Sequence, residues 1–110
     1  MARAIVQEPE ILLLDEPTSN LDIKHQLEVM RTVRLLVEKG GISAIMAMHD
    51  LNLASRFSDK IVMLKDGRVF EMGRPESVLI PENIEKVYGV RAEVIKDSTG
   101  RPYVMPIDSI

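Results

Sequence analysis

Two short apolar runs that end in polar residues constrain most strongly what this chain can fold into. The first run covers residues 11–14 and stops at Asp15 and Glu16. The second covers residues 42–48 and stops at His49. Apolar runs without polar alternates are typical of strands covered on both faces, as in a parallel sheet. The two runs therefore predict a parallel α/β core with polar residues just beyond the ends of its strands.

The segment between the two runs is predicted to form a helix. Asp22 is a good N-cap residue, and Gly40 and Gly41 end the pattern. The apolar residues between them are three or four positions apart, which places them on one stripe of the helix. They are Ile23, Leu27, Met30, Val33 and Val37.

A second helix and a third strand are predicted after the second apolar run. Asp50 is suited to cap a short helix, and residues 61–64 are a further candidate for a buried strand. Asp66 and Gly67 then give the strongest short hairpin signal in the chain. We therefore expect the strand to turn back over residues 68–72.

The last part of the chain predicts short helices and a closing pair of strands. Pro75 and Pro81 each suit the first turn of a helix. Residues 90–96 and 103–107 read as strands that are separated by a polar turn. The pattern is thus α/β in its first part and α+β in its second.

Length, charge and cysteine content exclude several classes of protein. The 110 residues carry 17 acidic and 14 basic side chains, a net charge of −3 and no cysteine. There is therefore no disulfide framework, thiolate zinc site or thiol nucleophile, and the near-even charge disfavours a nucleic-acid partner. No apolar run approaches the roughly 20 residues of a membrane span, and the N-terminus lacks a signal-peptide core. We expect a soluble, cytoplasmic chain.

The polar residues at the strand ends suggest chemistry with phosphate. Ligands of open α/β sheets bind beyond the carboxyl ends of the strands. Adjacent carboxylates such as Asp15 and Glu16 point in different directions, so one can hold a hydrated cation while the other faces a water molecule. Phosphoryl transfer to water needs this division of roles. A neutral imidazole such as His49 can in addition donate a hydrogen bond to a phosphate.

The same residues also have plain structural interpretations. Asp15 and Glu16 can be a solvated strand end. Asp22 and Asp50 are adequately explained as helix caps. His25, inside the predicted helix, reads as a surface or packing residue.

Two further functional interpretations are disfavoured: a role for the methionines beyond packing, and a metal site formed by the histidines together with the carboxylates. Met46, Met48 and Met63 lie in apolar runs and are most simply core residues. His25, His49 and the carboxylates lack the local spacing of a metal site.

Residues 11–22, ILLLDEPTSNLD, closely resemble the Walker B motif and D-loop of ATP-binding cassette (ABC) ATPases. His49 and Asp50 follow at the position of that family's switch histidine, or H-loop. Residues 1–9 resemble the end of the helix after the family's signature sequence, and residues 61–73 resemble the strand and hairpin after the H-loop. The tail over residues 81–106 is similar to the subgroup that serves iron–siderophore, haem and cobalamin importers.

The resemblance implies roles for particular residues. Asp15 would hold Mg²⁺ through water, and Glu16 would be the general base that polarises the attacking water. His49 would bind the γ-phosphate of ATP. Asp22 would act across a dimer of two cassettes, and Ser19 in the same loop would contribute to binding of the cofactor.

Three motifs of the family are absent from these 110 residues. There is no G-x-x-x-x-G-K-[ST] phosphate loop (Walker A), no glutamine loop and no signature sequence. We therefore expect no appreciable ATPase activity, and at best very weak nucleotide affinity, from this chain alone. Without the strand that leads into the phosphate loop, two strand edges are left unpaired. Either the neighbouring strands pair directly, or a second copy fills the gap.

The predicted fold class is therefore α/β. It is the C-terminal part of a P-loop NTPase (RecA-like) ABC cassette that lacks the Walker A strand and has a small β-rich extension. Residues 1–66 would form the Walker B, D-loop and H-loop half of the ATPase core. Residues 67–110 would form the hairpin, short helices and closing strands.

The function implied is part of the ATP-hydrolysing subunit of an ABC importer, with ATP and Mg²⁺ as the cofactors of the intact parent. Its partners would be a second cassette, a membrane permease and, indirectly, a substrate-binding protein, at the inner face of the cell membrane and without nucleic acid. The alternatives are a non-catalytic interaction or dimerisation module and, less favoured, a cassette protein of DNA repair or translation.

Overall fold

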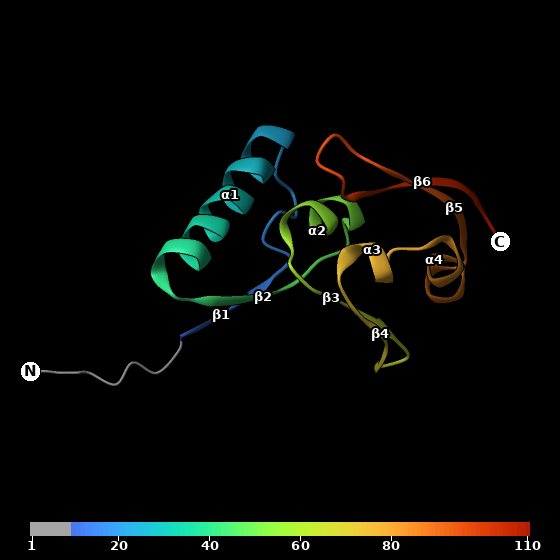
Figure 1. Cartoon of the computed structure of the whole chain (residues 1–110), viewed down its shortest axis with the longest axis horizontal. Helices are drawn as coiled ribbons and strands as arrows, with labels where there is room; N and C mark the ends of the chain where they lie inside the picture. The colour runs from blue at the N-terminus through green and yellow to red at the C-terminus, as the bar shows by residue number, and fades with distance from the viewer. Residues whose placement is uncertain (1–9) are drawn as a thin grey trace, which may run out of the picture. The chain divides into compact units, whose positions relative to one another are not determined.

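The computed structural model describes residues 10–110, and the predicted helix end at residues 1–9 lies outside them. The chain divides into two compact units, one ending at His49 and the other beginning at Asp50. Figure 1 shows the elements in chain order. The boundary predicted after residue 66 was drawn from motifs and stays a prediction.

The first unit is the predicted parallel strand–helix–strand unit. It consists of β1 (Ile11–Asp15), α1 (Ile23–Gly40) and β2 (Ser43–Ala47). β1 and β2 pair in parallel, with Leu13 opposite Ile45. A parallel pair requires a crossover, which α1 provides (Figure 1).

α1 begins and ends where the sequence signals place it. The Asp22 side chain caps its first turn, and Gly41 ends it with a left-handed φ of 66° that suits glycine. Met30 and Val33, on the predicted apolar stripe, are buried. None of the helices in residues 10–110 is long and apolar enough to cross a membrane.

The prediction that the first two strands are covered on both faces is wrong for the described chain. Ile11, Leu13 and Ile45 lie on one face of the β1–β2 sheet and are 61%, 72% and 60% exposed. Leu12 and Met46, on the opposite face, are half-buried. Successive side chains of a strand point to opposite faces, and α1 supplies a cover for one face only.

The second unit is built from short helices and two antiparallel hairpins. Its helices are α2 (Leu51–Phe57), α3 (Pro75–Val78) and α4 (Pro81–Tyr88). Its strands are β3 (Ile61–Lys65), β4 (Arg68–Gly73), β5 (Val90–Lys96) and β6 (Pro102–Ser109). These elements match the predicted ones, including proline in the first turn of α3 and α4.

The β3–β4 hairpin turns at Asp66 and Gly67, as predicted. Their φ angles of 53° and 75° are both positive, which is the geometry of a tight hairpin turn with the twist of its strands. The expectation of a fully buried strand is wrong here too, because Met63 is buried while Val62 and Leu64 are exposed.

The strands form three separate two-stranded sheets: β1 with β2, β3 with β4, and β5 with β6. β2 and β3 belong to different units, and their direct pairing, one of the two ways in which the sequence could close its gap, stays a prediction. Each described strand keeps one edge without a strand partner.

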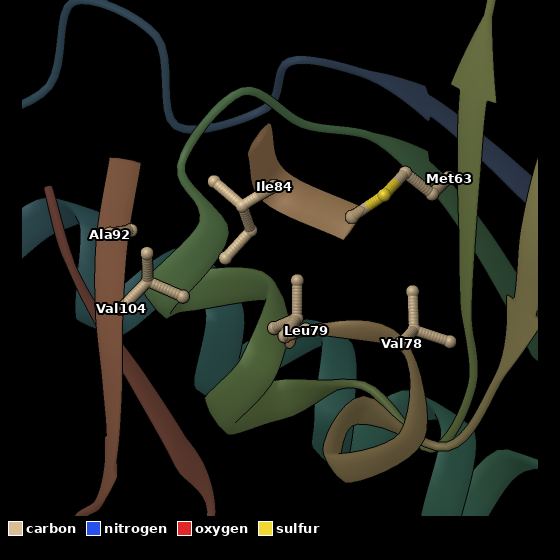
Figure 2. Packing of buried hydrophobic residues seen from close by; sticks show 6 residues of the cluster. All are labelled: Met63, Val78, Leu79, Ile84, Ala92 and Val104. Atoms are coloured by element: carbon tan, nitrogen blue, oxygen red, sulfur yellow. The ribbon is translucent and has the colours of Figure 1, made fainter. Parts of the chain in front are cut away.

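The hydrophobic core of the second unit gathers residues from most of its elements. Figure 2 shows its six buried side chains: Met63, Val78, Leu79, Ile84, Ala92 and Val104. The burial of Met63 agrees with its prediction as a core residue, whereas Met46 and Met48 in the first unit are only half-buried.

Polar contacts attach helix α2 to strand β6. The Asn52 side chain accepts from the Val104 N–H at 2.7 Å and donates to the Val104 carbonyl at 3.1 Å. The buried Ser55 hydroxyl donates to the Pro102 carbonyl at 2.6 Å. Arg101 donates to the carbonyls of Ser55 and Ser58 at 2.9 and 2.7 Å.

Candidate functional site

The parallel pairing of β1 and β2 brings their carboxyl ends to the same edge of the first unit. Asp15 is the last residue of β1, Glu16 follows it, and His49 lies two residues beyond β2. His49 Nε2 is 3.4 Å from Glu16 Oε2. The structure therefore places two predicted site residues from separate strands side by side.

The backbone at Glu16 is unusual. Its φ is 47°, in the left-handed region that side chains other than glycine, asparagine and aspartate rarely adopt. The Glu16 N–H donates to the Ala47 carbonyl at 2.8 Å, so the residue still belongs to the edge shared with β2. Conformations of this kind store about 1–3 kcal/mol and cluster at functional sites.

A tight turn carries the chain from Glu16 to helix α1. The Ser19 N–H donates to the Glu16 carbonyl at 3.1 Å, and the Leu21 N–H donates to the Thr18 carbonyl at 3.3 Å. Asn20 has a φ of 65°, which asparagine tolerates well. Thr18 is buried, while Ser19 is exposed.

Asp22 ends this turn and caps α1. Its Oδ1 accepts from the His25 N–H at 2.9 Å, and His25 Nδ1 lies 2.8 Å from the same oxygen. The cap prediction is confirmed for Asp22 and also for Asp50, which accepts from the N–H groups of Asn52 and Leu53. The ring contact of His25 was not foreseen. The sequence did contain a signal for this contact: a histidine in the third helical position after an aspartate cap. A side chain at that position faces back to the cap residue.

The site is open to solvent. The side chain of His49 is 83% exposed and that of Glu16 is 41% exposed. A side-chain contact with this exposure contributes little to stability, so stabilisation of the fold does not explain it. Within residues 10–110, no three or more His, Asp or Glu side chains form a group that could by themselves hold a metal ion.

The arrangement has a defined chemical capacity. A carboxylate and an imidazole 3.4 Å apart can together orient a water molecule or a bound oxyanion. Asp15, the last residue of β1 and the residue before Glu16, adds a further exposed carboxylate. Asp22 and Ser19 lie in the following turn. Ser19 contacts Glu16 through the backbone only, and in the described part of the chain no side-chain contact joins Asp22 or Ser19 to the Glu16–His49 pair.

Known proteins of similar sequence are ABC transporter ATP-binding proteins. An uncharacterised protein of this kind from Methanocaldococcus jannaschii is 56% identical over 107 residues, which cover 97% of this chain and 41% of that protein. The hemin import ATP-binding protein of Rhizobium meliloti is 48% identical over 90% of this chain and 38% of its own length. The cobalamin import ATP-binding protein of Halobacterium salinarum is 42% identical over 97% of this chain and 27% of its own length. The chain thus spans about two fifths or less of these relatives, and no protein-family model matches it.

Solved structures agree on the fold. An inward-facing metal-chelate type ABC transporter matches 89% of this chain and 40% of its own, with a TM-score of 0.77 and 21% identity. A dimeric ATP-binding cassette with ADP and phosphate bound matches 58% of this chain and 27% of its own, with a TM-score of 0.55 and 38% identity.

The chain has the α/β fold of part of an ATP-binding cassette. Its relatives specify the family: the chain is homologous to ABC transporter ATP-binding proteins and matches part of their length.

Proposed function

We propose that this chain is part of the ATP-hydrolysing subunit of an ABC importer for a metal chelate, such as an iron–siderophore, haem or cobalamin. The observation that carries the proposal is the Glu16–His49 pair at 3.4 Å on the edge where β1 and β2 end. The import of hemin and of cobalamin by two of the relatives supports the class of cargo.

Glu16 and His49 divide the work on the terminal phosphate. Glu16 accepts a hydrogen bond from the attacking water and orients it toward phosphorus. His49 donates to an oxygen of the γ-phosphate, where negative charge accumulates. The contact between the two side chains keeps the water and the phosphate oxygen within reach of one another.

Asp15 fits the part of a magnesium ligand. Its carboxylate offers hard oxygen donors, lies at an exposed strand end and is not engaged by the Glu16–His49 contact. When bound, Mg²⁺ would neutralise charge on the phosphate oxygens. Asp22 and Ser19 present the exposed turn before α1 to a second cassette and its nucleotide.

The roles proposed for these residues imply an assembly of several subunits. A second cassette completes the site across a homodimer, and a membrane permease transmits closure of the pair to the transport path. A substrate-binding protein takes part indirectly, and nucleic acid does not. The subunit works in the cytoplasm, at the inner face of the cell membrane.

We propose that these 110 residues alone do not hydrolyse ATP. They contain no glycine-rich loop with the lysine that would hold the triphosphate against Glu16 and His49. Calorimetry with Mg-ATP is expected to detect no binding in the micromolar range, and a micromolar dissociation constant would contradict the proposal.

The catalytic role is tested by replacing the matching segment of the M. jannaschii relative with this chain. The chimera is expected to hydrolyse ATP, and Glu16→Gln is expected to retain ATP but lower turnover by about 100-fold or more. Glu10→Gln, a carboxylate just before β1, is the matched control. Unchanged turnover in the Glu16 variant would remove Glu16 from the mechanism.

A non-catalytic interaction module is the second candidate function. It is favoured by the exposed apolar face of β1–β2 and by the unpaired strand edges, which together suit association with a second copy. Light scattering that shows a monomer at high concentration, with its strands intact, would exclude self-association.

A further inference from the structure

The cap residue Asp22 is held by two groups of one histidine. Its Oδ1 accepts from the backbone N–H of His25 at 2.9 Å and lies 2.8 Å from Nδ1 of the His25 ring. An N-cap needs only the first of these contacts. The second contact, with the His25 ring, is not needed for capping and therefore needs a separate explanation.

The contact fixes which ring nitrogen carries a hydrogen. An ionised carboxylate only accepts hydrogen bonds, so His25 Nδ1 must be the donor. The other nitrogen, Nε2, faces Glu28 Oε1 at 4.0 Å. At this distance Nε2 makes no hydrogen bond with Glu28, so the contact with Asp22 is the one that orients the ring.

The two oxygens of Asp22 consequently differ. Oδ1 is occupied by the backbone and the ring of His25, while residues 10–110 offer no hydrogen-bond partner to Oδ2. The Asp22 side chain is 68% exposed, so a partner from outside the described chain can reach it. With the backbone contact alone, the plane of the carboxylate could tilt about the Cβ–Cγ bond. The second contact, to the His25 ring, restricts this tilt.

We propose that His25 is a positioning residue that fixes the Asp22 carboxylate and presents Oδ2 to a second copy of the cassette. This rests on the proposed function, in which Asp22 acts across the dimer. His25 does not touch the nucleotide in this arrangement and works only through Asp22. If His25 only stabilised the helix, the orientation of Asp22 Oδ2 would not matter for function.

Three replacements of His25 separate these roles, because all of them keep the backbone N–H that caps the helix. His25→Asn places an amide nitrogen where Nδ1 lies, and His25→Gln places one nearer to Nε2. His25→Phe keeps a ring but has no donor. Glu28→Gln, which alters only the 4.0 Å contact, is the matched control.

Turnover is measured in the chimera that carries this chain. His25→Phe and His25→Gln are expected to lower kcat about tenfold with the KM for ATP unchanged, and His25→Asn to restore it, since small misplacements of a site residue cost factors of this size. Helix content and unfolding should be alike in the three variants. Equal kcat in wild type and His25→Phe, or no rescue by asparagine, would overturn the proposal.

Ring nitrogen-15 NMR on the 110-residue chain tests the contact without any catalysis. His25 is expected to carry its hydrogen on Nδ1 and to lose this state in Asp22→Asn, with His49 as the internal reference. A His25 ring with hydrogen only on Nε2 overturns the proposal. A chimera whose turnover ignores Glu16→Gln overturns the proposed function instead, so the two failures are distinguishable.

Discussion

Glu16 combines a strained backbone with a contact to the second strand end. Its left-handed φ of 47° turns the chain sharply after β1, and its carboxylate lies against His49. A glutamate has no conformational reason to occupy such a position, because glycine or asparagine adopts it at lower cost. The strain is therefore best understood as the cost of placing a carboxylate at this point.

Replacing Glu16 with asparagine is expected to stabilise the chain while it removes the proposed base. The free energy of unfolding should rise by about 0.5–1 kcal/mol, because asparagine tolerates positive φ and the exposed contact with His49 contributes little. Urea unfolding of the 110-residue chain measures it. Glu16→Ala, which keeps the strain, is the control, and a loss of stability on Glu16→Asn would contradict the interpretation.

At the scale of elements, the second unit depends on polar contacts between α2 and β6 as well as on its apolar core. Asn52 pairs with both backbone groups of Val104, as a neighbouring strand would, and Ser55 and Arg101 extend the contact. Val104 is buried, so its backbone groups have no access to water as a replacement partner.

Asn52→Ala is expected to lower the free energy of unfolding by about 1–3 kcal/mol, because it leaves the N–H and carbonyl of Val104 without their partners. Arg56→Ala, on the exposed part of the same helix, is the control and should cost less than about 1 kcal/mol. Urea unfolding of both variants measures the difference. Equal losses would show that the contacts with Val104 are not the cause.

The turn between β5 and β6 makes the stability of the hairpin depend on pH. Hydrogen bonds from the Thr99 hydroxyl and from the N–H groups of Arg101 and Thr99 lower the pKa of Asp97 below its usual 3.8. A lowered folded-state pKa gives stability that is complete above the unfolded-state pKa and is lost as the pH falls through the folded-state value.

Asp97→Asn should therefore destabilise the chain at neutral pH, and the difference from wild type should shrink as the pH falls below about 4. Urea unfolding over a pH series measures this, with Asp66→Asn in the other hairpin turn as the control. A difference that stays constant into acid would contradict the role of the charged carboxylate.

At the scale of the molecule, the apolar strands exceed what the described chain can cover. Each sheet has two strands, and large apolar side chains remain exposed on β1–β2 and on β3–β4. On β3–β4 they are Val62, Leu64, Val69, Phe70 and Met72. A surface of this kind favours association.

Leu12 and Leu13 give a matched test, because they are neighbours on opposite faces of β1. Leu13→Lys, at a 72% exposed position, is expected to change the free energy of unfolding by no more than about 1 kcal/mol and to reduce self-association. Leu12→Lys, at a half-buried position, should cost at least about 2 kcal/mol. Urea unfolding and light scattering measure the pair, and equal destabilisation would show that Leu13 is covered in solution.

The sequence by itself determined the elements and placed the candidate site residues at the ends of the first two strands. Aspartate caps, an Asp-Gly turn, prolines in first turns and apolar periodicity are local signals, and each one gave the element it predicted. The resemblance to ABC ATPases, carried by residues 11–22, agrees with the relatives of the chain. The roles of the individual site residues stay predictions.

The tertiary structure alone decided which distant groups meet and which apolar residues are covered. The contact of Glu16 with His49 arises from the parallel register of β1 and β2, and that of Asn52 with Val104 joins residues 52 positions apart. The apolar runs gave no sign that Leu13 and Val62 would be exposed. Local sequence sets backbone preferences over a few residues, whereas burial depends on which other segments are present to pack against a face.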